Sequence, residues 1–199
     1  MIGDLIKKIK QKKELSDIPD NFIERILKNY LQKYNISIPK NEKQQKLIIK
    51  EIRKELRNYI GRFQVKSNYQ NRLKLLEENK IQELLKTHSS TKERLENYNE
   101  IKEWIYNSNP TSILDLACGL NPIAIAKPGI SYIAIDIKGD ELKLIDLFFK
   151  QNKIHGKTIL ADITKIEDFP KADICLIFKT LDIIENKSHK KDLSFFVKN

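Results

Sequence analysis

The sequence is poor in cysteine, histidine and long apolar runs, and each shortage excludes a class of protein. Its two cysteines, Cys118 and Cys175, are far apart and form no Cys-x-x-Cys pair. Together with three scattered histidines, they predict neither a disulfide framework nor a metal site. No stretch approaches the roughly 20 apolar residues that span a bilayer, and the amino-terminal segment lacks the apolar run of a signal peptide. We therefore expect a cytoplasmic protein without a metal or a membrane partner.

Positive charge is concentrated in the first half of the chain. Residues 1–109 contain 24 Lys and Arg against 15 Asp and Glu, whereas residues 110–199 contain 13 against 12. Cationic side chains that neutralise phosphates release counterions, so this asymmetry favours a nucleic-acid partner. A solvated lysine-rich surface is the alternative interpretation. The change in charge divides the chain into a basic front half and a nearly neutral back half.

The front half is predicted to be helical. Apolar residues recur at spacings of three and four in the segments 3–15, 20–31, 43–60, 69–86 and 91–105. The third of these helices directs Leu47, Ile48, Ile52 and Leu56 inward. Its other face is basic and is the predicted phosphate-tracking surface. The residues of this predicted RNA-binding face are Lys43, Lys46, Lys50, Arg53, Lys54, Arg57 and Arg62.

After Asn109-Pro110 the pattern changes from helical to strand-like. Short apolar runs occur at 113–116, 132–135, 158–160 and 174–178, with a clear helix at 140–152. Buried parallel strands read as continuous apolar runs, and their alternation with helices indicates βαβ crossovers. The sequence therefore predicts an α/β protein, with an all-helical domain at 1–109 and a Rossmann-like sheet at 110–199. Such a sheet binds its ligand at the carboxyl ends of its strands.

The segment 112–122, Ser-Ile-Leu-Asp-Leu-Ala-Cys-Gly-Leu-Asn-Pro, is the most informative part of the chain. An apolar run enters Asp115, and the chain then turns at Gly119, whose backbone can approach a ligand closely. Seventeen residues later, the second predicted strand ends in Asp136, where such folds bind a ribose diol. An ordinary strand–turn–helix with an incidental aspartate is the alternative. It would explain the Gly119 turn alone or Asp136 alone, but it explains the two together, at this spacing, poorly.

Two cofactor classes use this geometry. A dinucleotide fold requires Gly-x-Gly-x-x-Gly, whereas residues 117–122 contain the single glycine Gly119. S-adenosylmethionine has no diphosphate to cradle, so one close approach of the backbone suffices. The sequence therefore favours S-adenosylmethionine over NAD.

Two motifs in a fixed order identify a family. His-Ser-Ser-Thr-Lys-Glu-Arg-Leu at residues 88–95 is followed by Leu-Asp-Leu-Ala-Cys-Gly-Leu-Asn-Pro at 114–122. This pair resembles the 16S ribosomal RNA guanine-N7 methyltransferases, which confer aminoglycoside resistance by methylating the decoding site. The resemblance spans about residues 80–186 and, more loosely, the basic front half, which the family uses to bind the small ribosomal subunit. It implies a class I methyltransferase with S-adenosylmethionine as cofactor and 16S rRNA as partner, and we expect a monomer.

The resemblance also implies roles for particular residues. Arg94, with Ser89 nearby, pairs with the methionine carboxylate, which a guanidinium binds bidentately. Gly119 lies under the methionine portion, Asp136 accepts from the ribose hydroxyls, and Asp162 faces the adenine amino group. A helix-capping acid is the alternative role for Asp162. The complete predicted cofactor site is Ser89, Arg94, Asp115, Gly119, Asp136, Asp162 and Glu185.

The implied chemistry requires no catalytic side chain. Guanine N7 has a lone pair and no proton, so attack on the methyl group needs alignment rather than a general base. Cys118 lies in the cofactor turn and is not expected to act as a nucleophile. The fourth strand ends in Phe178-Lys179-Thr180 and lacks the Asn/Asp-Pro-Pro-Tyr of adenine amino-group methyltransferases.

Two alternatives stay open. The family continues past its fourth strand with further strands, whereas the residues after Glu185 have room for one more at most. One alternative is therefore a ribosome- or RNA-binding relative without catalytic activity. The other is a methyltransferase acting on another RNA or on a small molecule, which would not require the basic front half.

Overall fold

The computed structural model describes residues 2–39, 41–60 and 68–178. Its chain divides into two compact units, Met1–Arg62 and Phe63–Asn199. This boundary lies well before residue 109, where the sequence analysis placed the end of the helical domain. The reason is that the helices between residues 69 and 107 contribute Leu76, Leu84 and Ile105 to the core beside the sheet. Helical periodicity shows that a segment buries one face, but not which unit it packs against.

The first unit is built from helices. Its elements are α1 (Ile2–Lys10), the 3₁₀ helix η1 (Lys13–Leu15), α2 (Asp20–Lys33) and α3 (Glu42–Ile60). Helices α1 and α2 pack on α3, and Ile9, Ile23 and Ile52 are completely buried there. Leu47, predicted to point inward, is 59% exposed, and Ile49 is buried in its place. Ile48, Ile52 and Leu56 are buried as predicted, so the apolar stripe of α3 differs from the predicted one at Leu47.

Two arginines of α3 hold the preceding helices in place. The Arg53 guanidinium donates to the backbone carbonyls of Lys8 and Ile9, the latter at 3.2 Å. Carbonyls in the last turn of a helix have no intrahelical partner, so Arg53 satisfies the end of α1. Arg57 donates to a carboxylate oxygen of Glu14 at 2.7 and 3.2 Å. Both arginines, predicted to follow RNA phosphates, thus make bonds within their own unit.

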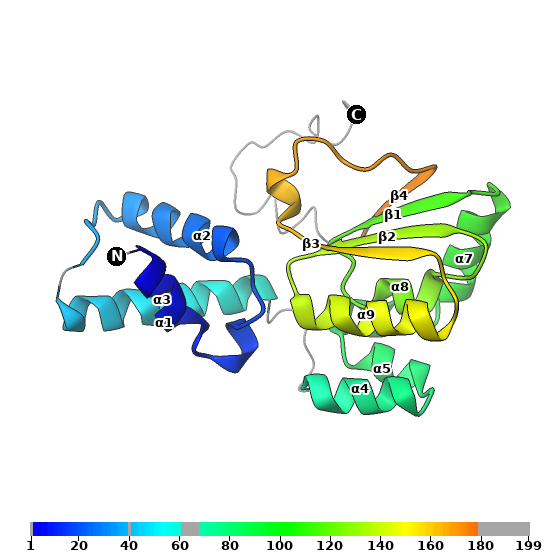
Figure 1. Cartoon of the computed structure of the whole chain (residues 1–199), viewed down its shortest axis with the longest axis horizontal. Helices are drawn as coiled ribbons and strands as arrows, with labels where there is room; N and C mark the ends of the chain where they lie inside the picture. The colour runs from blue at the N-terminus through cyan, green and yellow to red at the C-terminus, as the bar shows by residue number, and fades with distance from the viewer. Residues whose placement is uncertain (1, 40, 61–67, 179–199) are drawn as a thin grey trace. The chain divides into compact units, whose positions relative to one another are not determined.

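The second unit combines helices with a parallel sheet (Figure 1). Its helices are α4 (Tyr69–Glu77), α5 (Ile81–Lys86), α6 (Ser89–Glu93), α7 (Tyr98–Asn107), α8 (Asn121–Ile125), α9 (Gly139–Gln151) and η3 (Ile163–Lys165). Its strands are β1 (Ser112–Leu116), β2 (Ser131–Asp136), β3 (Gly156–Leu160) and β4 (Ile174–Ile177). The described strands pair in the order β3-β2-β1-β4, with Ile113 opposite Tyr132 and Ile174. The predicted α/β fold is confirmed.

Two helices predicted to be continuous are each divided in two. Between α4 and α5, Asn79 takes a left-handed backbone conformation with φ = 54°. That conformation ends a right-handed helix, and asparagine tolerates it better than most residues. The segment 91–105 is likewise divided between α6 and α7, with residues 94–97 between them. An apolar spacing that continues across a turn does not reveal such a break.

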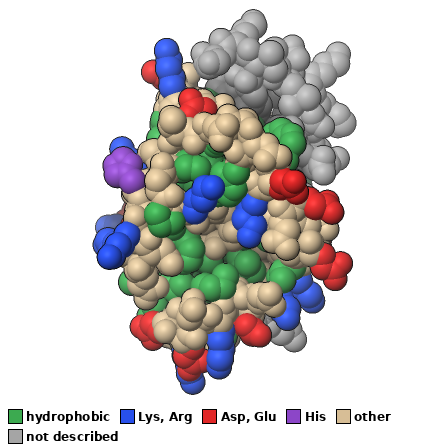
Figure 2. Space-filling view, turned by 90° about the vertical axis from the view of Figure 1, so that its right-hand side faces the viewer, with side chains coloured by type: hydrophobic (Ala, Val, Ile, Leu, Met, Phe, Trp, Pro, Cys, Tyr) green, Lys and Arg blue, Asp and Glu red, His purple; other side chains and the backbone are tan. Residues whose placement is uncertain are grey.

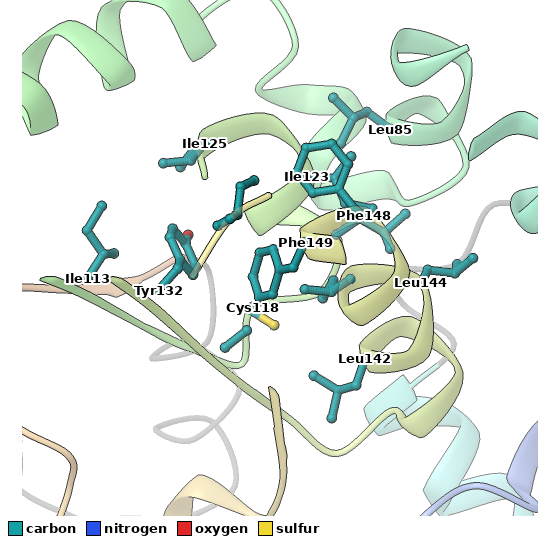
Figure 3. Packing of buried hydrophobic residues seen from close by; sticks show 14 of the residues in the cluster. Leu85, Ile113, Cys118, Ile123, Ile125, Tyr132, Leu142, Leu144, Phe148 and Phe149 are labelled. Carbon is teal, nitrogen blue, oxygen red and sulfur yellow. The ribbon is translucent and has the colours of Figure 1, made fainter. Parts of the chain in front are cut away.

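Both faces of the sheet are covered. On one face, α9 places Phe149 against Tyr132 of β2, with ring centroids 5.9 Å apart (Figure 3). On the other face, Ile163 of η3 packs in a cluster with Leu114 and Ile135. Coverage of both faces explains why β1 and β2 read as continuous apolar runs rather than as alternating ones.

The surface of the molecule on the side of α7 carries charges of both signs. Figure 2 shows acidic and basic side chains interspersed around apolar patches on this face. Among the residues described, no helix is long and apolar enough to cross a membrane.

Gly156 is predicted to be essential for the packing of α9 on β3. A Cβ atom at this position would lie 2.2 Å from Cδ2 of Phe149. We expect Gly156→Ala to lower the free energy of unfolding by about 1–3 kcal/mol, the usual range for overpacking, in urea denaturation followed by circular dichroism. In a Phe149→Leu background the same substitution should cost less, because the ring edge is gone. An equal cost in both backgrounds would contradict this account.

Candidate functional site

The carboxyl ends of three strands bring predicted site residues to one edge of the sheet. Asp136 is the last residue of β2, and it pairs in register with Leu160 at the end of β3. The backbone N–H of Ala161 donates to the Asp136 carbonyl at 2.9 Å. Asp162, the next residue, therefore lies at the same edge of the sheet. The end of β1 pairs with β2 on its other side. The structure therefore brings together the turn after β1, Asp136 and Asp162.

The turn after β1 is tight and left-handed at two positions. Ala117 has φ = 51° and Gly119 has φ = 53°. Between them, the Cys118 N–H donates to the Ile135 carbonyl at 3.1 Å, which ties the turn to β2. A left-handed conformation is easy for glycine but costs a residue such as alanine of the order of 1 kcal/mol. Strain of this kind concentrates at binding and catalytic sites.

Asp136 holds this turn through its carboxylate. One carboxylate oxygen accepts the Gly119 N–H at 2.8 Å, and the other accepts the Lys138 N–H at 3.0 Å. Burial, followed by the charge of Glu141, raises the pKa of Asp136 to about 7. The hydrogen bonds from the backbone oppose this rise. Asp136 is thus a buried acid whose carboxylate joins the turn after β1 to the start of α9.

Asp115 lies in a buried hydrogen-bond network behind the turn. Its Oδ2 accepts from Asn121 Nδ2 at 2.8 Å and from the Tyr132 hydroxyl at 2.7 Å. The Tyr98 hydroxyl in turn donates to Asn121 Oδ1 at 3.0 Å. Burial raises the pKa of Asp115 to about 6. Its Oδ1 is buried and has no hydrogen-bond partner among the described residues.

Arg94 follows α6 and carries a guanidinium with buried donors. The group lies over the ring of Phe178, 4.7 Å from the ring centroid. Its Nε and Nη1 are buried and find no hydrogen-bond partner within the part of the chain that is described. Buried donors are nearly always paired in proteins, so this arrangement suits an anionic ligand. Ser89 is half-buried at the start of the same helix.

Asp162 caps a helix. Its Oδ1 accepts from Thr164 at both the backbone N, 3.1 Å away, and the hydroxyl, 2.8 Å away. The capping role weighed in the sequence analysis is therefore present, and it leaves the carboxylate buried beside the sheet edge. Glu185 and Arg62, also predicted as site residues, lie outside the described residues.

Sequence reasoning missed several members of this site. Asn121 lies inside the motif that identified the turn, so its neighbours gave a signal for it. Tyr98 and Tyr132 had the apolar spacing of core residues, and nothing in that spacing indicates where a hydroxyl bonds. Among the described residues, no cluster of three or more His, Cys, Asp or Glu could hold a metal ion.

Asp115 is predicted to make stability depend on pH. Its pKa is higher in the folded chain than the ordinary value of 3.8, so the folded state holds its proton longer and stability falls as the pH rises between those values. Between about pH 4 and pH 6 we expect Asp115 to remove about 2–3 kcal/mol, at 1.36 kcal/mol per pKa unit. Urea denaturation of the unmodified chain and of Asp115→Asn across this range measures the effect. The free-energy difference between the two proteins should change with pH, and a constant difference would be the contrary result.

The sequence is similar to those of known proteins. Residues 77–195 match the family described as ribosomal RNA methyltransferase (FmrO). The 16S rRNA (guanine(1405)-N(7))-methyltransferase of Serratia marcescens is 31% identical over 109 residues, which cover 54% of this chain and 43% of that protein. The protein of the same name from Frankia casuarinae is 28% identical over 114 residues, covering 54% and 40%. The matched part therefore spans about two fifths of these relatives.

Solved structures are similar in fold. The 16S rRNA methylase RmtB aligns with 99% of this chain and 78% of its own, with a TM-score of 0.80 and 24% identity. An rRNA methylase from Escherichia coli aligns with 99% and 79%, with a TM-score of 0.82 and 24% identity. The family match covers more than half of the chain and includes the turn at Gly119, the Asp136 clamp and Arg94. The chain belongs to the ribosomal RNA methyltransferase (FmrO) family.

Proposed function

We propose that this protein transfers the methyl group of S-adenosylmethionine to a guanine N7 of 16S rRNA in the small ribosomal subunit. The observation that carries the proposal is the Arg94 guanidinium, which interacts with Tyr98 but whose buried Nε and Nη1 have no hydrogen-bond partner among the described residues, near the turn that Asp136 holds. The relatives from Serratia marcescens and Frankia casuarinae are named as methyltransferases of this type. The similar methyltransferase RmtF has a structure with S-adenosyl-L-homocysteine.

The residues present fit the methyl donor. The donor's carboxylate matches the Arg94 guanidinium, because a carboxylate accepts two parallel N–H bonds. Its ribose hydroxyls match Asp136, and its adenine amino group matches the buried acid Asp162. Gly119 allows the close backbone approach that a side chain would block. We propose these four residues, with Ser89, as the donor site, and Glu185 and the buried Asp115 remain proposed members of it.

The proposed reaction is an in-line displacement. The guanine N7 lone pair would attack the methyl group on the donor's sulfonium. As the N7–CH3 bond forms, the S–CH3 bond breaks, which leaves neutral S-adenosylhomocysteine and a positively charged 7-methylguanine. Because N7 carries no proton, no side chain has to remove one, and the protein's task is to align the two reactants. The Gly119 turn, which the Asp136 carboxylate holds through the Gly119 N–H, is suited to fixing the donor for that purpose.

Arg94 is predicted to control donor affinity without affecting RNA binding. We expect Arg94→Ala to weaken binding of S-adenosylhomocysteine by about 10- to 100-fold, because hydrogen bonds to a charged group contribute about 1.5–3 kcal/mol. Arg94→Lys should recover only part of the loss, since an ammonium cannot bind a carboxylate bidentately. Calorimetric titration measures the affinity.

The control for Arg94 is Lys92→Ala, which removes an exposed cation from α6, the short helix that ends just before Arg94. This variant should bind S-adenosylhomocysteine like the unmodified chain. Affinity for small ribosomal subunits should stay constant in all three variants. Unchanged donor affinity in Arg94→Ala would contradict the role assigned to Arg94.

RNA binding is proposed for the first unit. Residues 1–62 hold 16 Lys and Arg against 8 Asp and Glu, so most of the net charge of +10 belongs to this unit. A groove of about 490 Å³ opens along α1 and α3. Six cationic side chains line it, namely Lys8, Lys12, Lys46, Lys50, Arg53 and Arg57. We propose that its exposed lysines, with Lys43 and Lys54, contact RNA phosphates, while Arg53 and Arg57 hold the groove together.

Reversal of two groove lysines tests this surface. Lys46→Glu combined with Lys50→Glu should weaken binding to small ribosomal subunits about tenfold or more and reduce the slope of log affinity against log salt by about 2. The matched control is Lys28→Glu with Lys33→Glu, which reverses two charges on α2 of the same unit. Equal losses in the two double variants would show a general charge effect and contradict the groove. Filter binding at several salt concentrations measures both quantities.

The remaining alternatives differ in measurable ways. A relative without catalytic activity would bind small subunits and transfer no methyl group. A methyltransferase for a small molecule would not require the basic first unit, whose charge favours RNA. We propose that the protein works as a monomer in the cytoplasm, where its ribosomal partner is found.

A further inference from the structure

A buried charged cluster lies beneath the Gly119 turn, and none of the roles proposed above uses it. Arg72 of α4, His88 just before α6 and Glu141 of α9 are 4%, 7% and 2% exposed. They come from three separate parts of the second unit and meet in its interior. Ionised groups are costly to bury, so their presence here calls for a specific role.

Glu141 is the centre of this cluster. Its Oε1 accepts from Arg72 Nη1 at 3.1 Å, and its Oε2 lies 3.9 Å from His88 Nε2. Arg72 also donates through Nη2 to the Thr87 carbonyl at 2.7 Å. Arg72 therefore holds both Glu141 and the backbone that leads into His88.

His88 is in direct contact with the turn. A Cβ atom on Gly119 would lie 2.8 Å from His88 Cε1 and 2.9 Å from Nε2, so the imidazole packs against the glycine itself. The Gly119 N–H is held at the same time by Asp136. A shift of the imidazole would consequently move the turn that Asp136 clamps.

We propose that Glu141, held by Arg72, is a positioning residue: it fixes His88 under the Gly119 turn and acts through its negative charge on Asp136. This inference rests on the proposed donor site, in which the Asp136 carboxylate accepts hydrogen bonds from the ribose hydroxyls. Glu141 touches neither reactant in this account. It acts on the donor through His88 and Asp136.

The electrostatic part of this role follows from the surroundings of Asp136. Burial is the largest cause of its raised pKa, and the charge of Glu141 is the second. Burial is also the main reason why the pKa of His88 is lowered. The charge of Glu141 opposes this change, and the positive charges of Arg72 and Arg94 add to it. Several other charged or titratable residues surround the Gly119 turn and Asp136. They are Arg72, His88, Arg94, Asp115, Cys118, Lys138 and Glu141.

The test is Glu141→Gln, which keeps an oxygen for Arg72 and removes the charge. The ¹³C NMR titration of the Asp136 carboxyl in the donor-free chain should shift to lower pH, by an amount on the order of one pH unit. Affinity for S-adenosylhomocysteine, measured by calorimetry over the same range, should fall with decreasing pH in the unmodified chain. In Glu141→Gln that fall should occur at correspondingly lower pH.

Two further variants separate charge from packing. Asp140→Asn removes a negative charge from the neighbouring, partly exposed position of α9 and should leave both profiles unchanged. The double variant Arg72→Met/Glu141→Leu replaces the buried pair by apolar side chains of similar size, which folded proteins often accept. It should fold and titrate Asp136 at lower pH. Above the pH range of that titration, where Asp136 is ionised in both proteins, it should bind S-adenosylhomocysteine more weakly than the unmodified chain because His88 is no longer held.

The outcomes are distinguishable. An unchanged Asp136 titration in Glu141→Gln overturns the proposal. If the Asp136 titration shifts in Glu141→Gln but the pH dependence of S-adenosylhomocysteine affinity does not, the proposed effect of Glu141 on donor binding is overturned. If the unmodified chain binds no S-adenosylhomocysteine at any pH, the proposed function fails, while the Asp136 titration still decides whether Glu141 acts on this carboxyl.

Discussion

The hydrogen bond from the Gly119 N–H to the Asp136 carboxylate, 2.8 Å long, is the interaction on which the site depends. It joins the turn after β1 to the end of β2. It requires a residue at 119 that tolerates both φ = 53° and the imidazole of His88 against its Cα. It also requires a buried acid, whose second oxygen organises the entry into α9 through Lys138. This one contact holds the turn after β1, with its left-handed Ala117 and Gly119, at the carboxyl edge of the sheet.

The cost of this arrangement explains much of what surrounds it. Burial makes Asp115 and Asp136 weaker acids than they are in water. Hydrogen bonds partly offset this effect of burial. Asn121 and Tyr132 donate to Asp115, and backbone N–H groups donate to Asp136. Perturbed acids concentrated at one sheet edge are typical of a binding site rather than of a packing core. Beneath the turn, the buried pair of Arg72 and Glu141 lies beside His88. The imidazole of His88 in turn packs against Gly119.

Local patterns predicted the sheet, and long-range contacts escaped prediction. Strands β1 to β4 and the turn at Gly119 were evident because continuous apolar runs and a glycine are local signals. Arg72 and Glu141 are 69 residues apart, and no spacing links them. The RNA-binding role predicted for the basic face of α3 stays a prediction, and periodicity could not show that Arg53 bonds to the end of α1. The donor contacts carried over by resemblance stay predictions, and those at Glu185 and Arg62 fall outside the described residues.

The most direct test of the account is methyl transfer to the ribosome. The purified chain would be incubated with small ribosomal subunits and S-adenosylmethionine, and the 16S rRNA would then be digested and analysed by mass spectrometry for 7-methylguanosine. We expect a new 7-methylguanosine in 16S rRNA, absent when Arg94→Ala replaces the unmodified chain. Tight binding to subunits and to S-adenosylhomocysteine without any new methylated guanosine would contradict it and would identify a ribosome-binding relative without catalytic activity.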